Sequence, residues 1–116
     1  MENILQKAIE YSDYQSSLNV QKKFLREKFD SDITFGKNGG LFKIDRDLIL
    51  FTKFLIDANK VTDVVVLDEN KNPILINNVI EFNKEIVDRY FSALGSFHAG
   101  YEELKTARNM KQLGKL

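Results

Sequence analysis

A glycine-rich loop that carries one lysine is the first segment whose residue types could do chemistry. It spans residues 36–40, with the sequence Gly-Lys-Asn-Gly-Gly, and loops of this kind can cradle a phosphate group. A phosphate loop also needs a serine or threonine directly after its lysine and a helix behind it, so that backbone N–H groups and the helix dipole meet the anion. Residues 41–44 alternate like a strand instead, so the loop is predicted to be the turn of a β-hairpin.

Three polar residues at alternate positions have the pattern that opens a calcium-binding loop. Asp68, Asn70 and Asn72 have the spacing of its first ligands. The sixth position of such a loop needs glycine and the twelfth needs glutamate, but Pro73 and Val79 stand there. A solvated hairpin turn is therefore predicted, and no metal-binding residue is expected.

The single histidine, His98, lies one helical turn before Glu102. Such a pair can serve in general acid–base catalysis, but it is also an ordinary contact on a helix surface. The chain has no cysteine, which excludes thiolate nucleophiles, disulfides, cysteine-ligated zinc and iron–sulfur clusters. We therefore expect no catalytic residue, no cofactor and no enzymatic activity. A carboxylate–tyrosine site in an apolar groove, which leaves no signature in a sequence, is the enzymatic alternative.

Basic residues recur at helical spacing near the C-terminus and could contact phosphate groups. The chain has 17 lysine and arginine residues against 17 aspartate and glutamate residues, for a net charge of zero. Binding to nucleic acid or to a membrane surface needs a basic field, so helix capping and solubility explain these residues more simply. The alternative is a weak nucleic-acid-binding accessory protein. Its phosphate contacts would be Lys105, Arg108, Lys111 and Lys115, with Lys22, Lys23 and Arg26 completing the stripe.

The length and composition fit one ordinary folded domain. The chain has 116 residues, of which 43% are hydrophobic, and a domain of this size buries roughly two-thirds of its unfolded surface. The sequence opens Met-Glu-Asn, without a basic and then apolar leader, and its longest apolar runs have four residues, against the ~20 that cross a bilayer. We expect a single soluble domain over residues 1–116, located in the cytoplasm.

Residues 32–77 are predicted to form two β-hairpins with a helix between them. Residues 33–35 and 42–44 alternate apolar with polar, while residues 61–67 and 74–76 are β-branched runs on either side of a polar turn. Asp45 is a good N-cap for the helix that follows the first hairpin. Apolar residues lie on several sides of this helix, so we expect it to be buried at the centre of the fold.

The segment after Asn78 is predicted to be one long helix over residues 79–111. Asn78 and Glu81 have the spacing of a capping box, and a seam of residues then follows at intervals of three and four, as in a coiled coil. The positions of this seam are 80, 83, 87, 90, 94, 97, 101 and 104. The helix would be ~50 Å long at about 1.5 Å per residue, which is longer than a compact domain of this mass is wide. Its seam therefore needs a partner. The candidate interface residues are Val87, Tyr90, Leu94, Phe97, Tyr101 and Leu104.

A second helix, over residues 3–29, offers a partner within the chain. Its apolar residues also recur every seven positions, and short connections favour an antiparallel pair. Small residues such as Gly100 on the C-terminal helix indicate close approach of another helix. The predicted fold is therefore α+β in the order α-β-β-α-β-β-α, with two β-hairpins and a central buried helix flanked by long N- and C-terminal helices packed as an antiparallel pair.

Long helices around two hairpins resemble the topology of a prefoldin alpha-type subunit, whose hairpins assemble into a barrel and whose helices form tentacles. The likeness covers most of the chain and fails at residues 48–56, where a helix separates the hairpins. Residues 38–44 (Asn-Gly-Gly-Leu-Phe-Lys-Ile), residues 72–76 (Asn-Pro-Ile-Leu-Ile) and the pattern Tyr101…Lys105…Arg108 resemble small uncharacterised proteins of marine contractile-tailed phages. That resemblance implies no known activity. It implies a phage accessory or virion-assembly component, present in the host cytoplasm or in the virion.

These observations together predict a non-enzymatic interaction or assembly protein. The chain would oligomerise, or dock on a larger complex, through the face of its C-terminal helix. Protein is the expected partner, either a second copy or a larger assembly. Nucleic acid is a weaker alternative, and no membrane contact is expected.

Overall fold

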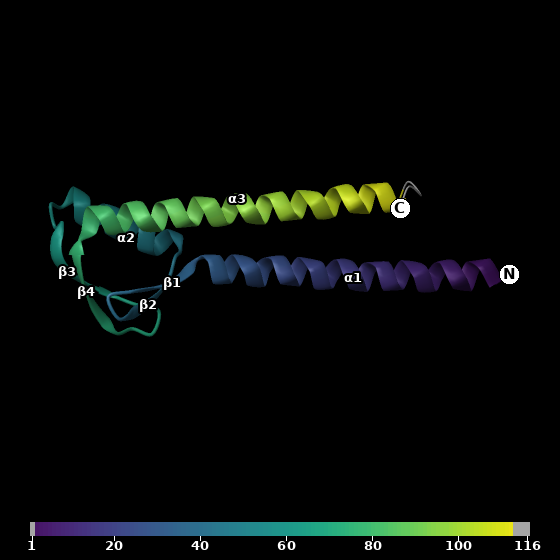
Figure 1. Cartoon of the computed structure of the whole chain (residues 1–116), viewed down its shortest axis with the longest axis horizontal. Coiled ribbons are helices and arrows are strands. Elements are labelled where there is room, and N and C mark those ends of the chain that lie inside the picture. Colours follow the sequence, from purple (N-terminus) through teal and green to yellow (C-terminus); the bar gives the residue numbers. More distant parts are fainter. Residues whose placement is uncertain (1, 113–116) are drawn as a thin grey trace. The chain divides into compact units, whose positions relative to one another are not determined.

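The computed structural model describes the backbone of residues 2–112 and the side-chain environment of residues 4–107. Its elements in chain order are α1 (Glu2–Asp32), β1 (Thr34–Lys37), β2 (Gly40–Lys43), α2 (Arg46–Asp57), β3 (Thr62–Leu67), β4 (Pro73–Asn78) and α3 (Val79–Gln112) (Figure 1). The α+β class and the predicted order α-β-β-α-β-β-α are confirmed. None of the described helices is both long enough and apolar enough to pass through a membrane.

The strands form two separate two-stranded antiparallel sheets, one from β1 and β2 and one from β3 and β4. Asn38 and Gly39 make the turn of the first hairpin, with φ angles of 52° and 83°. Asparagine and glycine are the residues that best tolerate this left-handed region, and such a turn matches the twist of a tight hairpin. Both predicted hairpins are therefore present, and the glycine-rich loop is one of their turns.

The described chain divides into two compact units, and both long helices contribute to each of them. The hairpin unit comprises Phe29–Ser96, and the helical unit comprises Met1–Lys28 together with Phe97–Leu116. The hairpin unit has an aromatic centre, because Phe42 and Phe82 are each 1% exposed and their rings meet edge to face with centroids 5.1 Å apart. Around them pack the buried residues Ile33, Phe35, Ile44, Leu55, Val66, Ile74, Ile76, Val79, Ile86 and Ala93.

Helix α2 packs one face on this core and leaves the other exposed. Its start is fixed by Asp45, whose side chain accepts a hydrogen bond of 2.7 Å from a backbone N–H of the first turn. Thr52 and Leu55 are its buried residues, whereas Leu50 and Phe54 are 64% and 63% exposed. The prediction of a central helix buried on several sides is therefore wrong. Two small sheets and one long helix supply neighbours for only one side of α2.

Helix α3 is continuous, and its core-facing side is rotated from the predicted seam. Asn78 Oδ1 accepts a hydrogen bond of 3.1 Å from the N–H of Glu81, so the predicted cap is present. The buried residues along the helix are Val79, Phe82, Ile86 and Ala93. Each of them lies one residue before a seam position, namely Ile80, Asn83, Val87 and Leu94. One residue corresponds to about 100° around an α-helix, so much of the predicted seam faces away from the core.

Gly95 lies inside α3 and has open space around it. A Cβ atom built on Gly95 would have no heavy atom within 4 Å, and glycine inside a helix is about 1 kcal/mol less favourable than alanine. We expect Gly95→Ala to raise the free energy of unfolding by about 0.5–1 kcal/mol, measured by urea denaturation. A loss of stability in this variant would show that the glycine is needed for a bend or for a contact outside the protomer.

In the helical unit, α1 and α3 pack closely and run antiparallel. A Cβ atom on Gly100 would lie 2.6 Å from Cδ2 of Leu25, and the Nζ atom of Lys22 lies 5.9 Å from the ring centroid of Tyr101. Leu18, earlier still in α1, shares a small pocket with Lys105. Residue numbers therefore fall along α1 as they rise along α3, which is the predicted antiparallel pairing, with a glycine at the closest approach.

Candidate protein-interaction surfaces

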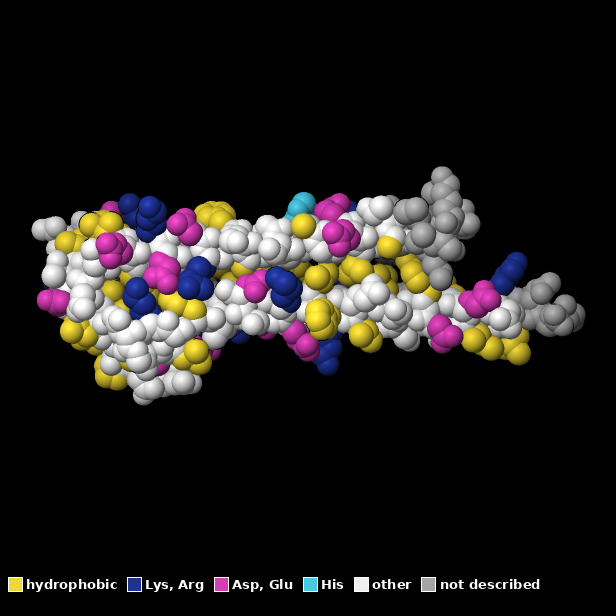
Figure 2. Space-filling model, in the orientation of Figure 1, with side chains coloured by type: hydrophobic (Ala, Val, Ile, Leu, Met, Phe, Trp, Pro, Cys, Tyr) yellow, Lys and Arg dark blue, Asp and Glu magenta, His cyan; other side chains and the backbone are white. Residues whose placement is uncertain are grey.

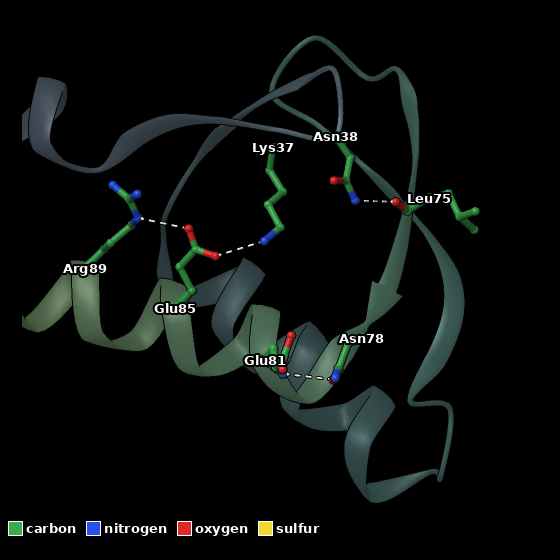
Figure 3. A network of polar contacts seen from close by, with 7 residues as sticks. All are labelled: Lys37, Asn38, Leu75, Asn78, Glu81, Glu85 and Arg89. Carbon is green, nitrogen blue, oxygen red and sulfur yellow. Dashed lines mark hydrogen bonds and ion pairs between the residues drawn. The ribbon is translucent and has the colours of Figure 1, made fainter.

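The glycine-rich loop and its lysine have packing roles in the hairpin unit. A strand follows the loop, and a Cβ atom on Gly40 would lie 2.5 Å from Cγ1 of Ile74. Lys37 Nζ lies 3.1 Å from Glu85 Oε2, and the second oxygen of Glu85 lies 3.3 Å from Nε of Arg89 (Figure 3). The loop therefore lacks the helix that a phosphate site needs, and its lysine ties the first hairpin to α3.

Asp68 is a buried carboxylate that joins the two hairpins. It is 5% exposed, and its Oδ2 accepts a hydrogen bond of 3.0 Å from the N–H of Leu41 in β2. Its Oδ1 accepts bonds of 3.0 and 2.8 Å from the N–H groups of Asn70 and Asn72. These bonds, the one from Leu41 foremost, lower the pKa of the Asp68 carboxyl below its ordinary value. Backbone N–H groups therefore fill the positions that a calcium ion would take, and no cluster of three metal ligands occurs in the described part of the chain.

The other polar candidates are exposed and pair within the helical unit. His98 Nε2 lies 3.6 Å from Glu102 Oε1, and Lys105 Nζ lies 3.7 Å from the same atom. Pairs of this kind on a helix surface contribute only about 0.2–0.5 kcal/mol, and they bring no nucleophile to the histidine.

Among the basic candidates of α1, Lys22 lies over the ring of Tyr101 and Lys23 Nζ lies 4.0 Å from Glu27 Oε1. The candidates Arg108, Lys111 and Lys115 lie outside the described side chains.

The six predicted interface residues are divided between packed and exposed positions. Tyr90 packs against the core of the hairpin unit, with its ring 6.2 Å from that of Phe29. Phe97 and Leu104 are half-buried in the helical unit, and Tyr101 is 41% exposed. The other two lie on the side of α3 that is rotated away from the core; Val87 is half-buried there and Leu94 is exposed.

That uncovered side of α3 is an apolar stripe, here named the α3 flank. It consists of Ile80, Val87, Phe91 and Leu94, whose spacings of seven, four and three place them on one side of the helix. Phe91 is 67% exposed, Ile80 is 54% exposed and Leu94 is 39% exposed. Sequence reasoning missed Phe91 because it lies off the seam. Phe91 lies four residues after Val87 and three before Leu94, and this spacing could have identified it as an apolar residue on the same side of the helix.

A second apolar area covers the outer side of the second hairpin and α2, and is named here the hairpin–helix surface. Its residues are 45–64% exposed; they are Leu50, Phe51 and Phe54 of α2, Val65 and Leu67 of β3, and Leu75 of β4. A groove of about 390 Å³ separates α2 from β3. Phe51, Val65 and Leu67 line it together with charged residues, among them Asp47 and Lys71. Apolar side chains reach the surface over the strands as well as along both long helices (Figure 2).

Apolar exposure is unusually extensive in this chain. Among the described residues, seventeen large hydrophobic side chains are exposed, whereas thirteen hydrophobic residues are buried. The helical unit adds Val20 and Phe24, which border a groove of about 370 Å³ over Leu25 and Gly100. Single exposed apolar residues are normal on protein surfaces, but apolar residues gathered on one face, as on the α3 flank, are typical of sites of protein or ligand contact.

Comparisons with protein-family models, with curated proteins and with solved structures found no match. The assignment of function therefore rests on the surfaces themselves. Their chemistry is apolar contact. Of the polar candidates with described side chains, Lys37 and Asp68 are engaged in the fold, and His98 pairs with Glu102 on the helix surface.

Proposed function

We propose that this protein is a non-enzymatic interaction protein that oligomerises, or docks on a larger assembly, through the exposed side of its C-terminal helix. The observation that carries the proposal is the α3 flank, an apolar stripe that runs along four turns of a continuous helix without cover from the core. A virion-assembly component, as the resemblance to phage proteins implies, is one form that such a role would take.

The α3 flank has the composition of an interface centre. Phe91 is a large aromatic residue at its middle, and exposed aromatic residues flanked by aliphatic ones are the anchors that dominate protein–protein binding energies. Covering a fully exposed phenylalanine or leucine contributes about 1.5–3 kcal/mol. The four apolar residues of the α3 flank, three exposed and one half-buried, suit the apolar face of a partner helix, which would complete a coiled-coil-like contact.

We expect Phe91→Asp to weaken association at least tenfold while leaving the fold intact. The reason is that the aspartate would place an unpaired charge at the centre of an apolar contact, and an interface anchor is worth about 2 kcal/mol or more. Phe91 is 67% exposed, so the folded protomer loses little packing. Sedimentation velocity over a range of concentrations measures the effect, on the protein alone and on any complex it forms.

Ser92→Asp is the matched control, because Ser92 is the next residue, is exposed and lies off the α3 flank. This variant carries the same added charge on the same helix and should associate like the native protein. Equal association by Phe91→Asp, Ser92→Asp and the native protein would mean that the α3 flank is not the docking surface.

A further inference from the structure

Strand β3 has a free edge, and the register of its hairpin shows which atoms point there. At the hairpin end, the N–H of Asp68 donates to the carbonyl of Asn72 at 3.0 Å. Hydrogen-bonded and non-hydrogen-bonded pairs alternate along an antiparallel ladder, so the pair Leu67–Pro73 and the pair Val65–Leu75 are non-hydrogen-bonded. The N–H and C=O groups of Val65 and Leu67 therefore point away from β4, toward the outer edge of the sheet.

Outward-pointing backbone groups of β4 and β2 make hydrogen bonds within the described part of the protomer, whereas those of β3 do not. On β4, the outward carbonyl of Leu75 accepts a hydrogen bond of 2.9 Å from Asn38 Nδ2 (Figure 3). On β2, Leu41 donates to Asp68 and accepts from the N–H of Glu69 at 2.8 Å. Within the described residues, no hydrogen bond reaches the outward groups of Val65 or Leu67. An exposed edge of this kind is a template for another strand.

The last four residues of β3, residues 64–67, carry no charge or proline that would protect their edge against such pairing. The strand reads Thr-Asp-Val-Val-Val-Leu over its six residues. Its one irregularity is Asp63, an exposed charged residue with a φ of 51° and no partner in the register, which confines the regular edge to the residues after it. The side chains of Val65 and Leu67 are each 56% exposed on its outer face. The groove of about 390 Å³ runs beside this edge, with Phe51 on its other wall.

We propose that a second copy of this chain pairs its β3 with this edge, antiparallel and about a two-fold axis at Val66. In that register Val65 of one copy lies opposite Leu67 of the other, and the two equivalent pairs exchange four backbone hydrogen bonds. The ladder stops there, because Asp63 has a φ of 51° and the N–H of Glu69 is donated to β2. The result is a four-stranded sheet in the order β4-β3-β3-β4.

A second copy fits this edge because the edge is complementary to itself. Each copy offers the same two donors and two acceptors in the same spacing, and each apolar side chain meets an apolar one across the axis. The six half-exposed residues of the hairpin–helix surface offer on the order of 500 Å² of apolar area. Stable interfaces bury about 800 Å² per partner, about 65% of it apolar in homodimers. The apolar area of this surface is therefore comparable to the apolar part of one side of a homodimer interface.

This dimer uses the hairpin–helix surface and is independent of the α3 flank. Its test is sedimentation velocity of the full chain at rising concentration, for the native protein and for Val65→Pro. The substitution removes an N–H that makes no hydrogen bond inside the protomer, at a strand position where proline is tolerated. It removes two of the four intermolecular bonds, so we expect dimerisation to weaken at least about tenfold.

Val65→Thr is the matched control, because it keeps the N–H and the β-branched shape and should still dimerise. Hydrogen exchange of the native protein gives a second readout, which stands even if the proline variant fails to fold. The amides of Val65 and Leu67 should become protected as the concentration rises. A native protein that stays monomeric up to near-millimolar concentration, or amides whose exchange does not depend on concentration, would overturn the proposal. If Phe91→Asp abolished the dimer and Val65→Pro did not, the proposed β3 pairing would be wrong and the α3 flank would be the dimer interface.

Discussion

Replacing Phe82 by alanine should remove about 3–5 kcal/mol from the free energy of unfolding, the typical effect of deleting a buried aromatic ring. Phe82 is 1% exposed. Its ring centroid lies 5.1 Å from that of Phe42 and 6.3 Å from that of Phe35. The substitution would open a cavity where α3 meets the first hairpin. Because small domains are stable by only about 5–15 kcal/mol, this loss is a large fraction of the stability of the fold.

Urea denaturation followed by circular dichroism measures this loss, and Phe91→Ala is the control. Phe91 lies on the same helix but is 67% exposed, so its truncation should change the stability of the protomer by no more than about 0.5 kcal/mol. If the two alanine variants were equally stable, the assignment of the buried side of α3 would be wrong. Comparing Phe82→Ala with Phe91→Ala therefore distinguishes the residues of α3 that stabilise the protomer from those we assign to binding.

Asp68→Asn should destabilise the protein strongly at neutral pH and much less in acid. The native carboxylate accepts hydrogen bonds from the N–H groups of Leu41, Asn70 and Asn72. An asparagine keeps one oxygen and turns an NH₂ group toward a backbone donor, so at least one of these three N–H groups loses its acceptor. Because Leu41 belongs to the other hairpin, the loss would loosen the contact between the two sheets.

The pH dependence follows from the lowered pKa of Asp68. A carboxyl whose pKa is lower in the folded than in the unfolded state stabilises the fold above its unfolded pKa, and this stabilisation is lost as the pH falls through the folded value. The difference in the free energy of unfolding between the native protein and Asp68→Asn should therefore be largest at neutral pH and become smaller as the carboxyl is protonated in acid. Denaturation curves across the acid range measure it, with Asp63→Asn, an exposed position, as control. A difference that does not change with pH would mean that Asp68 does not act as a charged acceptor.

Local signals in the sequence predicted the elements well. The caps Asp45 and Asn78 form the expected hydrogen bonds, and Asn38 and Gly39 adopt the expected turn. These features depend on a few neighbouring residues and on steric rules that hold in any protein. The antiparallel pairing of the long helices also followed from the pattern, because a glycine at Gly100 predicted a close approach.

Which face of each helix is covered could not be read from the sequence. Helix α3 carries apolar residues at both Val79 and Ile80, and again at Ala93 and Leu94, so two neighbouring stripes fit a helical period. Tertiary packing selected the first stripe, and the exposed stripe shares residues with the predicted seam. For α2, an apolar composition on several sides cannot show how many neighbours the fold supplies, and Phe54 is left in solvent.

The interaction surfaces were predicted only in part, for the same reason. Val87 and Leu94 belong to the α3 flank, while Tyr90 is part of the core and Phe91 was not a candidate. The free edge of β3 left no signal at all, because its sequence would also suit a strand inside a larger sheet. Its exposure depends on the number of strands in that sheet, which only the structure gives.

Photo-cross-linking from position 91 tests the proposed role of the α3 flank most directly. A photoreactive phenylalanine analogue replaces Phe91 in the full-length protein, made at native level in its own host, and position 92 carries the same group as a control. We predict a discrete protein adduct from position 91, either two copies of the chain or one defined partner, that is weak or absent from position 92 and disappears when Leu94 is changed to aspartate. Equal or absent adducts from the two positions would contradict the assignment.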